Sequence, residues 1–422
     1  MTTTTVRGLD PATIGSYDRR ASSRPAAAAN VRARWRMGIE ARALVLVTGV
    51  LLAFGLAVLY SASAIVAMQY GHGSAHFLIR QVQGVLIGAV AFAACAKIDA
   101  ERLRKLAWPI MALSILAMLI TVLPFTQSIA PRINGSRRFL LGGSLQPSEL
   151  AKLAVIVWTS MLLVKKQENG SVRHPTKGMI PFVLVVGALA LLAALEPDMS
   201  IAMMFFLIMA IILFAGGVRI GHFIMMGLLG VPVLVKLLAS KPYIVERMKS
   251  YVAIVAPFLF DEVATKASKE ISYQLEQSLV AVGSGGWFGV GFGKGMQQYG
   301  FLPFPYSDFI GSNVGEEWGF VGLAVLTLLF GVYAWLGFRI AKRARTPFLN
   351  LVAVGLTTTM VLTAFLHVGV VVGLLPTTGL TLPFISYGRS NLILSLLMTG
   401  ILVNIGSEKQ RVVGEHATDP LT

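Results

Sequence analysis

The chain has 422 residues, of which 55% are hydrophobic and only 13% are charged, and its mean hydropathy is +0.72. A soluble globular domain averages about 25% charged residues, so this composition excludes that class. Continuous apolar runs of about 20 residues recur along the chain and predict membrane-spanning helices, whereas the strands of a β-barrel would alternate. The net charge of +16 is expected from basic cytoplasmic loops, and no nucleic-acid partner is predicted.

Residues 1–42 are rich in Thr, Ala and Arg, and their low apolar content predicts a disordered basic cytoplasmic tail. No short apolar region with a small-residue cleavage site precedes the first long apolar run, so a cleaved signal peptide is not expected. The one cysteine, Cys95, lies inside an apolar run and is interpreted as a packed hydrophobic residue.

Ten apolar segments are predicted to form transmembrane helices of one all-α domain over residues 43–407. An interruption by Glu-Pro-Asp at 196–198 predicts two spans joined by a tight turn, because proline lacks an N–H donor and charges are costly in the bilayer. The segments lie near 43–66, 78–96, 106–124, 149–164, 179–195, 199–217, 221–239, 316–338, 349–373 and 385–405.

The basic residues predict the orientation of these spans. With the N terminus inside, every inside connection is basic, which agrees with the positive-inside rule and places the tail at 408–422 in the cytoplasm. The outside then holds 125–148, the turn at 196–198, the long loop 240–315 and 374–384. Two of these outside loops are also basic. A negatively charged ligand on the outer face would explain them, and contact with lipid headgroups is the alternative.

Acidic residues gather in the stretch 301–322, just before the eighth apolar segment. Pro305 and Ser307 predict that a helix begins here. A polar stripe on such a helix should face a wet cavity or other protein, although Asp308 could instead only cap the helix and interact with its dipole. The predicted stripe comprises Asp308, Ser312, Gly315, Glu316 and Gly319.

Three further stretches carry polar motifs on the same predicted side of the membrane. Residues 271–300 begin as an amphipathic segment with Gln274 and Gln277 on its polar face, which suits an interfacial helix, and continue as a glycine-rich loop. Residues 135–158 contain two adjacent arginines, which could bind phosphate oxygens, followed by the start of a helix. Residues 377–391 form a broken start to the last span, as occurs where a helix end lines a cavity. The four stretches are expected to converge on one site.

The motifs GSRRFLLGGSLQPSELAKLA, EPDMS, YQLEQSLVAVGSGGWFGVGFGKG, LPFPYSDFIGSNVGEEWGFVG and LPFISYG, in this order, resemble the SEDS family (shape, elongation, division, sporulation) over residues 43–407. The resemblance implies ten transmembrane helices, a periplasmic site in the bacterial inner membrane and peptidoglycan glycosyltransferase activity on lipid II. It also implies a class B penicillin-binding protein and other division-complex membrane proteins as partners. The long N-terminal tail and the Gly-Glu-Glu at 315–317 resemble the division branch, FtsW, more than the elongation branch, RodA. An elongation-type polymerase, a member of the sporulation branch, a lipid II flippase and a non-catalytic division scaffold are the alternatives.

The resemblance also assigns site residues. Asp308 stands where the family has its essential aspartate and is predicted to be the general base that activates a sugar hydroxyl in an inverting transfer. Phe304 and Tyr306 depart from the Glu and His that the family commonly has, and Arg389 replaces a glycine. The departing pyrophosphate needs neutralisation by cationic side chains or a divalent cation such as Mg²⁺ or Mn²⁺, and no other cofactor is expected. The predicted substrate-binding residues are Arg137, Arg138, Gln146, Ser148, Glu149, Lys152, Asp198, Gln274, Gln277, Lys294, Glu316, Ser386 and Arg389.

Overall fold

The computed structural model describes residues 31–123, 126, 130–131, 137–140, 145–170, 175–255 and 266–413. The chain forms two compact units, a helical unit at 37–407 and a smaller unit built from the two flanking segments. In the flanking segments, strand β1 (Val31–Met37) pairs with strand β2 (Ser407–Val413). This pairing corrects the prediction of a disordered tail over all of residues 1–42, since Val31, Ala33 and Trp35 alternate with arginines, a strand pattern. Residues 1–30 and 414–422 lie outside the described residues.

Each of the ten predicted apolar segments coincides with a helix. Eight of these helices are long and apolar enough to cross a membrane, and the other two, α6 and α12, have 17 residues each. They are α1 (Ile39–Gln69), α2 (His76–Lys97), α3 (Arg102–Val122), α4 (Pro147–Glu168), α5 (Pro175–Leu195), α6 (Met199–Ala215), α7 (Ile220–Ala239), α10 (Ile310–Lys342), α11 (Pro347–Val371) and α12 (Arg389–Ile405). The protein is therefore a helical, multi-pass membrane protein.

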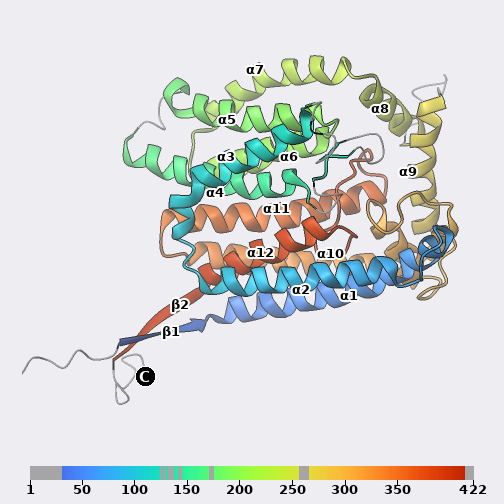
Figure 1. Ribbon diagram of the computed structural model, residues 1–422. Helices are drawn as coiled ribbons and strands as arrows, with labels where there is room; N and C mark the ends of the chain where they lie inside the picture. The colour runs from blue at the N-terminus through green and yellow to red at the C-terminus, as the bar shows by residue number, and fades with distance from the viewer. Residues whose placement is uncertain are drawn as a thin grey trace, which may run out of the picture. The chain divides into compact units, whose positions relative to one another are not determined.

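The described residues of the long predicted loop between α7 and α10 include two more helices, α8 (Pro242–Val255) and α9 (Lys266–Gly285), and a 3₁₀ turn, η5 (Gln297–Tyr299). The amphipathic start of 271–300 is helical as predicted, within α9. In Figure 1, α9 crosses one end of the layer in which α10 and α11 run side by side. The hydroxyl of Tyr251 on α8 donates to the carbonyl of Leu374, 2.8 Å away, and so ties α8 to the loop after α11.

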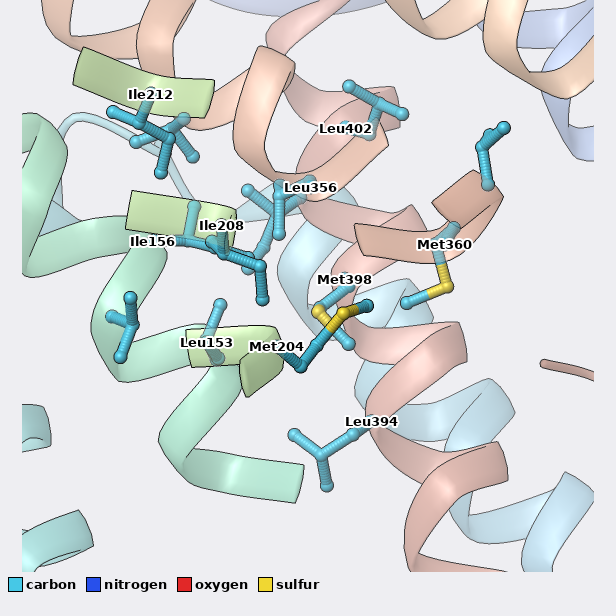
Figure 2. Packing of buried hydrophobic residues seen from close by; sticks show 14 of the residues in the cluster. Leu153, Ile156, Met204, Ile208, Ile212, Leu356, Met360, Leu394, Met398 and Leu402 are labelled. Atoms are coloured by element: carbon cyan, nitrogen blue, oxygen red, sulfur yellow. The ribbon is translucent and has the colours of Figure 1, made fainter. Parts of the chain in front are cut away.

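Helix α4 is the most enclosed of the eight long helices. In its most apolar stretch of 18 residues, 89% of the residues are buried, compared with 7% in α7. Its side chains pack with α6, α11 and α12, as Leu153, Ile208 and Met398 illustrate in Figure 2. The predicted pair of Glu149 and Lys152 is confirmed, with Oε2 and Nζ 2.8 Å apart and both side chains buried. Charges held inside a membrane protein are expected to pair in this way.

The turn at 196–198 separates α5 from α6 as the sequence predicts. Pro197 adopts a positive φ of 31°, and the Asp198 carboxylate accepts a hydrogen bond from the Ile201 N–H at 3.3 Å, which caps α6. The Ser200 hydroxyl donates to the carbonyl of Thr378, 2.7 Å away. The tight turn is thereby fixed against the loop that leads to α12.

Helix α10 begins at Ile310 and not at Pro305, so the predicted polar stripe from Asp308 to Gly319 is wrong. Asp308 lies in a turn in which the N–H groups of Ser307 and Phe309 both point to the carbonyl of Phe304. These backbone bonds form a compact turn in place of the first helical turn. The stripe is interrupted a second time by a break in α10 at Gly319, where φ is 65° and ψ is −162°.

The glycine-rich loop after α9 packs into the break in α10. The N–H groups of Val290 and Gly291 donate to the carbonyls of Glu316 and Glu317, and the N–H of Phe320 donates to the carbonyl of Gly286. A Cβ at Gly319 would lie 2.4 Å from the nitrogen of Gly289, so the two backbones meet only because both residues are glycines. The loop thus completes hydrogen bonds that a continuous helix would have made internally.

Candidate functional site

Three of the four predicted stretches meet around the turn that carries Asp308. The side chain of Asp308 is half-buried, and its Oδ2 lies 3.7 Å from the position that a Cβ on Gly379 would occupy. The Ser386 hydroxyl donates to the carbonyl of Ser307 at 2.7 Å, and the Tyr387 N–H donates to the carbonyl of Tyr306 at 2.9 Å. The residues after α11 therefore hold the Asp308 turn in place through its backbone.

Arg138 connects the turn at 196–198 to this site. Its Nη1 lies 3.5 Å from Oδ2 of Asp198, and its Nη2 donates to the carbonyl of Pro197 at 2.7 Å. A longer bond, 3.3 Å, joins its Nε to the carbonyl of Glu196. These three contacts orient the guanidinium, and its positive charge acts on both Asp198 and Asp308.

Burial raises the pKa of the Asp308 carboxyl above its ordinary value, while a hydrogen bond with Ser307 and the charges of Arg138 and Arg247 act against that rise. Burial also raises the pKa of Asp198, again opposed by Arg138. The site thus holds two desolvated acids whose ionised forms depend on a shared guanidinium. Arg247 on α8 was not assigned to the site from sequence, although its presence in a basic outside loop gave a signal.

Glu196, next to the paired Asp198, is buried and bonded to the hydroxyl of Thr121 on α3. Burial raises its pKa to about 8, and the neighbouring charge of Asp198 adds to that rise. The Glu-Pro-Asp turn therefore contributes two acids with different roles. Asp198 pairs with Arg138, whereas Glu196 ties the turn to α3.

Two polar residues inside the spans support the site and were missed in the sequence. The Nε2 of Gln81 on α2 donates to the carbonyl of Ser386 at 3.0 Å, and its Oε1 accepts from the Gly388 N–H at 3.2 Å. His367 on α11 has Nδ1 2.8 Å from the carbonyl of Leu380, and its Nε2 accepts from the Gly311 N–H at 3.3 Å. His367 is an isolated polar residue in an apolar segment, which was an available signal, whereas Gln81 lies between Arg80 and Gln83 and did not stand out.

An aromatic cluster of Phe77, Tyr306 and Tyr387 adjoins the Asp308 turn. The rings of Phe77 and Tyr306 stack with centroids 4.6 Å apart, and the ring of Tyr387 meets Phe77 edge to face at 5.0 Å. Burial raises the pKa of Tyr306 to about 12, so its phenol stays protonated at neutral pH. The departure from the family's histidine therefore places a neutral aromatic residue two positions before Asp308.

The other predicted residues of the outside loop 125–148 and of the stretch after it lie before or at the start of α4. The Nη1 of Arg137 donates to the carbonyl of Leu123 at 3.1 Å, and the Gln146 N–H donates to the hydroxyl of Ser390 at 2.9 Å. Ser148 is buried and directly precedes Glu149 of the Glu149–Lys152 pair, whose charges both act on Asp198. These positions lie close to the site, and their contact with substrate stays a prediction.

The remaining predicted residues have neighbours other than the Asp308 turn. Both carboxylate oxygens of Glu316 face the glycine loop, with the Met296 N–H 2.7 Å from Oε1, so this acid anchors the loop. Lys294 is exposed and lies along its own loop, and Arg389 packs beside Gly84 of α2. Gln274 and Gln277 are half-buried on α9. Substrate binding by these five residues stays a prediction.

No group of three or more His, Cys, Asp or Glu side chains is placed to hold a metal ion within the described part of the chain. The groups that converge here are two carboxylates and arginine side chains. Such a set can accept a proton from a hydroxyl and offset the negative charge of a phosphate or diphosphate.

The sequence matches the family of the cell cycle proteins FtsW, RodA and SpoVE over residues 42–411. It is 35% identical to the probable peptidoglycan glycosyltransferase FtsW of Trichlorobacter lovleyi over 366 residues, which cover 86% of this chain and 92% of that protein. It is also 35% identical to the stage V sporulation protein E of Bacillus subtilis over 364 residues, 86% of this chain and 95% of that protein.

Solved structures with the same fold include a chain of a peptidoglycan synthase complex that coordinates polymerization and crosslinking. That chain has a TM-score of 0.68 and 25% identity, with 86% of this chain and 97% of the other covered. The rod shape determining protein RodA of Thermus thermophilus has a TM-score of 0.59 and 24% identity, over 86% of this chain and 95% of RodA. The predicted family is thereby confirmed.

Proposed function

The chain belongs to the FtsW, RodA and SpoVE family and is a peptidoglycan glycosyltransferase, and we propose that it polymerises lipid II into β-1,4 glycan strands for the division septum. The observation that carries this proposal is the position of Asp308, a desolvated carboxylate beside the Arg138–Asp198 pair where three loops converge. Similarity to FtsW and the Gly-Glu-Glu sequence at 315–317 support the division role.

In the proposed reaction, Asp308 accepts the proton of the acceptor sugar's 4-hydroxyl while that oxygen attacks the anomeric carbon of the donor. The bond between the anomeric carbon and the diphosphate oxygen breaks, and the lipid diphosphate leaves with the electron pair. One displacement inverts the anomeric centre from α to β. A raised pKa makes Asp308 a stronger base than an exposed carboxylate, and Arg138 keeps the ionised form populated.

Diphosphate is already a good leaving group, so it needs positive charge more than it needs an acid. Arg138 binds the turn at 196–198, and Arg137 next to it donates to the carbonyl of Leu123, so these two cations are the candidates to supply that charge. A divalent cation, if the enzyme uses one, would supply the same neutralisation, with Asp308 and Asp198 as the acidic side chains available to it.

We further propose ten membrane spans, with both termini in the cytoplasm and Asp308 on the outer side. Helices α6 and α12 are each about 26 Å long, which approaches the thickness of the bilayer core. Basic residues at the other end of α10, namely Arg339 and Lys342, support an inner location for that end. The similarity to a chain of a synthase complex supports a crosslinking partner, a class B penicillin-binding protein.

Polymerisation by the purified protein tests the proposal directly. The protein, with and without a class B partner, is incubated with lipid II, and glycan strands are separated from unreacted and translocated lipid II. Strand formation supports the polymerase. Translocation without strands would instead identify a flippase, and neither product in the presence of the partner would favour a scaffold.

A further inference from the structure

The loop after α9 presents apolar side chains to the surroundings at one defined level of the helical unit. Trp287 is 70% exposed and Phe288 is 82% exposed, and Phe320 of α10 is also exposed beside them. The rings of Trp287 and Phe320 meet edge to face with centroids 5.2 Å apart. Between Glu276 and Asp308, Lys294 is the one charged residue in the sequence. A water-facing loop would not be expected to expose this much aromatic surface.

Trp287 and Phe288 form the aromatic tip of this loop. Backbone hydrogen bonds at the break in α10 fix the position of the tip along α10. The Val321 N–H donates to the carbonyl of Trp287 at 3.1 Å, and the Gly289 N–H donates to the carbonyl of Gly285 at 2.7 Å. Because the loop is bonded directly to α10, Trp287 and Phe288 stay beside Phe320 and cannot move along the helix independently. The depth of α10 in the membrane therefore sets the depth of the tip.

The charge pattern of α10 places that level at a membrane boundary. Residues 320–338 contain no charged side chain and correspond to about 29 Å of helix, close to the hydrocarbon thickness of a bilayer. Arg339 follows at one end, where it covers the ring of Trp335 at 4.9 Å. Glu316 and Glu317 precede the other end. Trp335 and the Trp287 tip thus occupy the two interfaces, where aromatic residues are enriched.

Helix α1 gives an independent measure of the hydrocarbon layer that residues 320–338 of α10 span. At one end, Glu40 pairs with Arg339 at 3.3 Å, and at the other the Ser61 hydroxyl donates to the carboxylate of Glu317. The segment from Arg42 to Ser61 corresponds to about 30 Å of helix. Both helices therefore place the break in α10 at the hydrocarbon boundary on the side of the Asp308 turn.

We propose that Trp287 and Phe288 insert into the lipid leaflet on the Asp308 side and anchor the glycine-rich loop to the membrane surface. The occupant of this apolar surface is lipid, because the tip continues the exposed face of a membrane-spanning helix at its interfacial level. Through the amide bonds from Met296 and Gln297 to Glu316, the anchored tip also fixes the segment that leads to Asp308.

A depth measurement tests this insertion without relying on enzymatic activity. Phe288→Cys in a Cys95→Ser background is labelled with an environment-sensitive fluorophore and reconstituted in nanodiscs that contain phosphatidylcholine brominated near the acyl carbonyls. Tyr299→Cys is the matched control, since Tyr299 is exposed in the same loop but its carbonyl bonds Gln69 at the far end of α1. We expect at least about twofold stronger quenching at position 288 than at position 299.

A conservative variant serves as a second measurement in case the labelled protein does not fold. Trp287→Phe should reduce the lipid-quenchable part of the intrinsic tryptophan fluorescence, to which the exposed Trp335 also contributes, while leaving the elution profile of the protein unchanged. Equal quenching at positions 288 and 299, or an unchanged quenchable fraction in Trp287→Phe, would overturn the insertion. Protection of position 288 from both brominated lipid and aqueous iodide would also overturn it, because that result identifies a protein surface over the tip.

Discussion

Arg138 and Asp198 form an ion pair, with Nη1 and Oδ2 3.5 Å apart, and both of their charges act on the carboxyl of Asp308. The pair therefore links the turn between α5 and α6 to the residue proposed as general base. Because Arg138 also donates to the carbonyls of Glu196 and Pro197, its guanidinium is held in place before any substrate arrives.

Asp308→Asn should remove polymerisation while preserving the fold. The amide keeps the size of the side chain but cannot accept the proton, so the rate should fall by at least about 100-fold. Glycan strands formed from lipid II by the purified variant give the readout, and its melting temperature gives the control for folding. Glu276→Gln, an exposed acid on α9, should retain activity. Strand synthesis by Asp308→Asn at the wild-type rate would remove Asp308 from the role of base.

Arg138→Ala should shift the acidic limb of the pH–rate profile to higher pH. Arg138 lowers the pKa of Asp308, so its loss raises that pKa and leaves the base protonated up to a higher pH. The ratio of the variant rate to the wild-type rate should therefore be smaller at about pH 6 than at about pH 9. Rates measured across this range with saturating lipid II test the effect. A uniform loss at every pH would show that Arg138 acts on binding or folding alone.

Glu196→Gln should reduce the pH dependence of stability. In the folded protein burial raises the pKa of Glu196 to about 8, whereas the unfolded chain has the ordinary value. The folded state therefore binds the proton more tightly, and this contribution to stability, present below the unfolded pKa, is lost as the pH rises through about 8.

The wild-type protein should accordingly lose on the order of 2 kcal/mol between about pH 6 and about pH 9, and the glutamine variant should lose less. Melting temperatures in detergent over this range check the prediction. Parallel curves for the two proteins would show that Glu196 is ionised in the fold.

Gly319→Ala should destabilise the protein strongly. The residue has φ of 65° and ψ of −162°, and a Cβ would meet the Gly289 nitrogen at 2.4 Å and the Trp287 carbonyl at 2.7 Å. A loss of about 2 kcal/mol or more is expected from strain and from displacement of the loop. Gly331→Ala in the same helix is the matched control, because nothing lies within 4 Å of its Cβ position. Equal melting temperatures for the two variants would contradict this account of the break.

The sequence by itself determined the class of the protein and the approximate positions of its ten apolar helices. Long apolar runs can be recognised from the local sequence alone. In the bilayer, each spanning helix must form all its backbone hydrogen bonds internally, so no contact with another segment is needed to define it. The same local reasoning separated α5 from α6 at Pro197 and paired Glu149 with Lys152. The motifs also identified the family and singled out Asp308 as the candidate base.

Only the tertiary structure decided how the polar residues are distributed among roles. Spacing alone placed Asp308 and Glu316 on one helical stripe, but α10 begins only at Ile310, so Asp308 lies in the preceding turn and Glu316 lies in the helix. Glu316 bonds a loop, while Asp308 joins Arg138 and Asp198 from distant parts of the chain. Such contacts depend on backbone pairing between remote segments, and helical periodicity carries no information about that pairing.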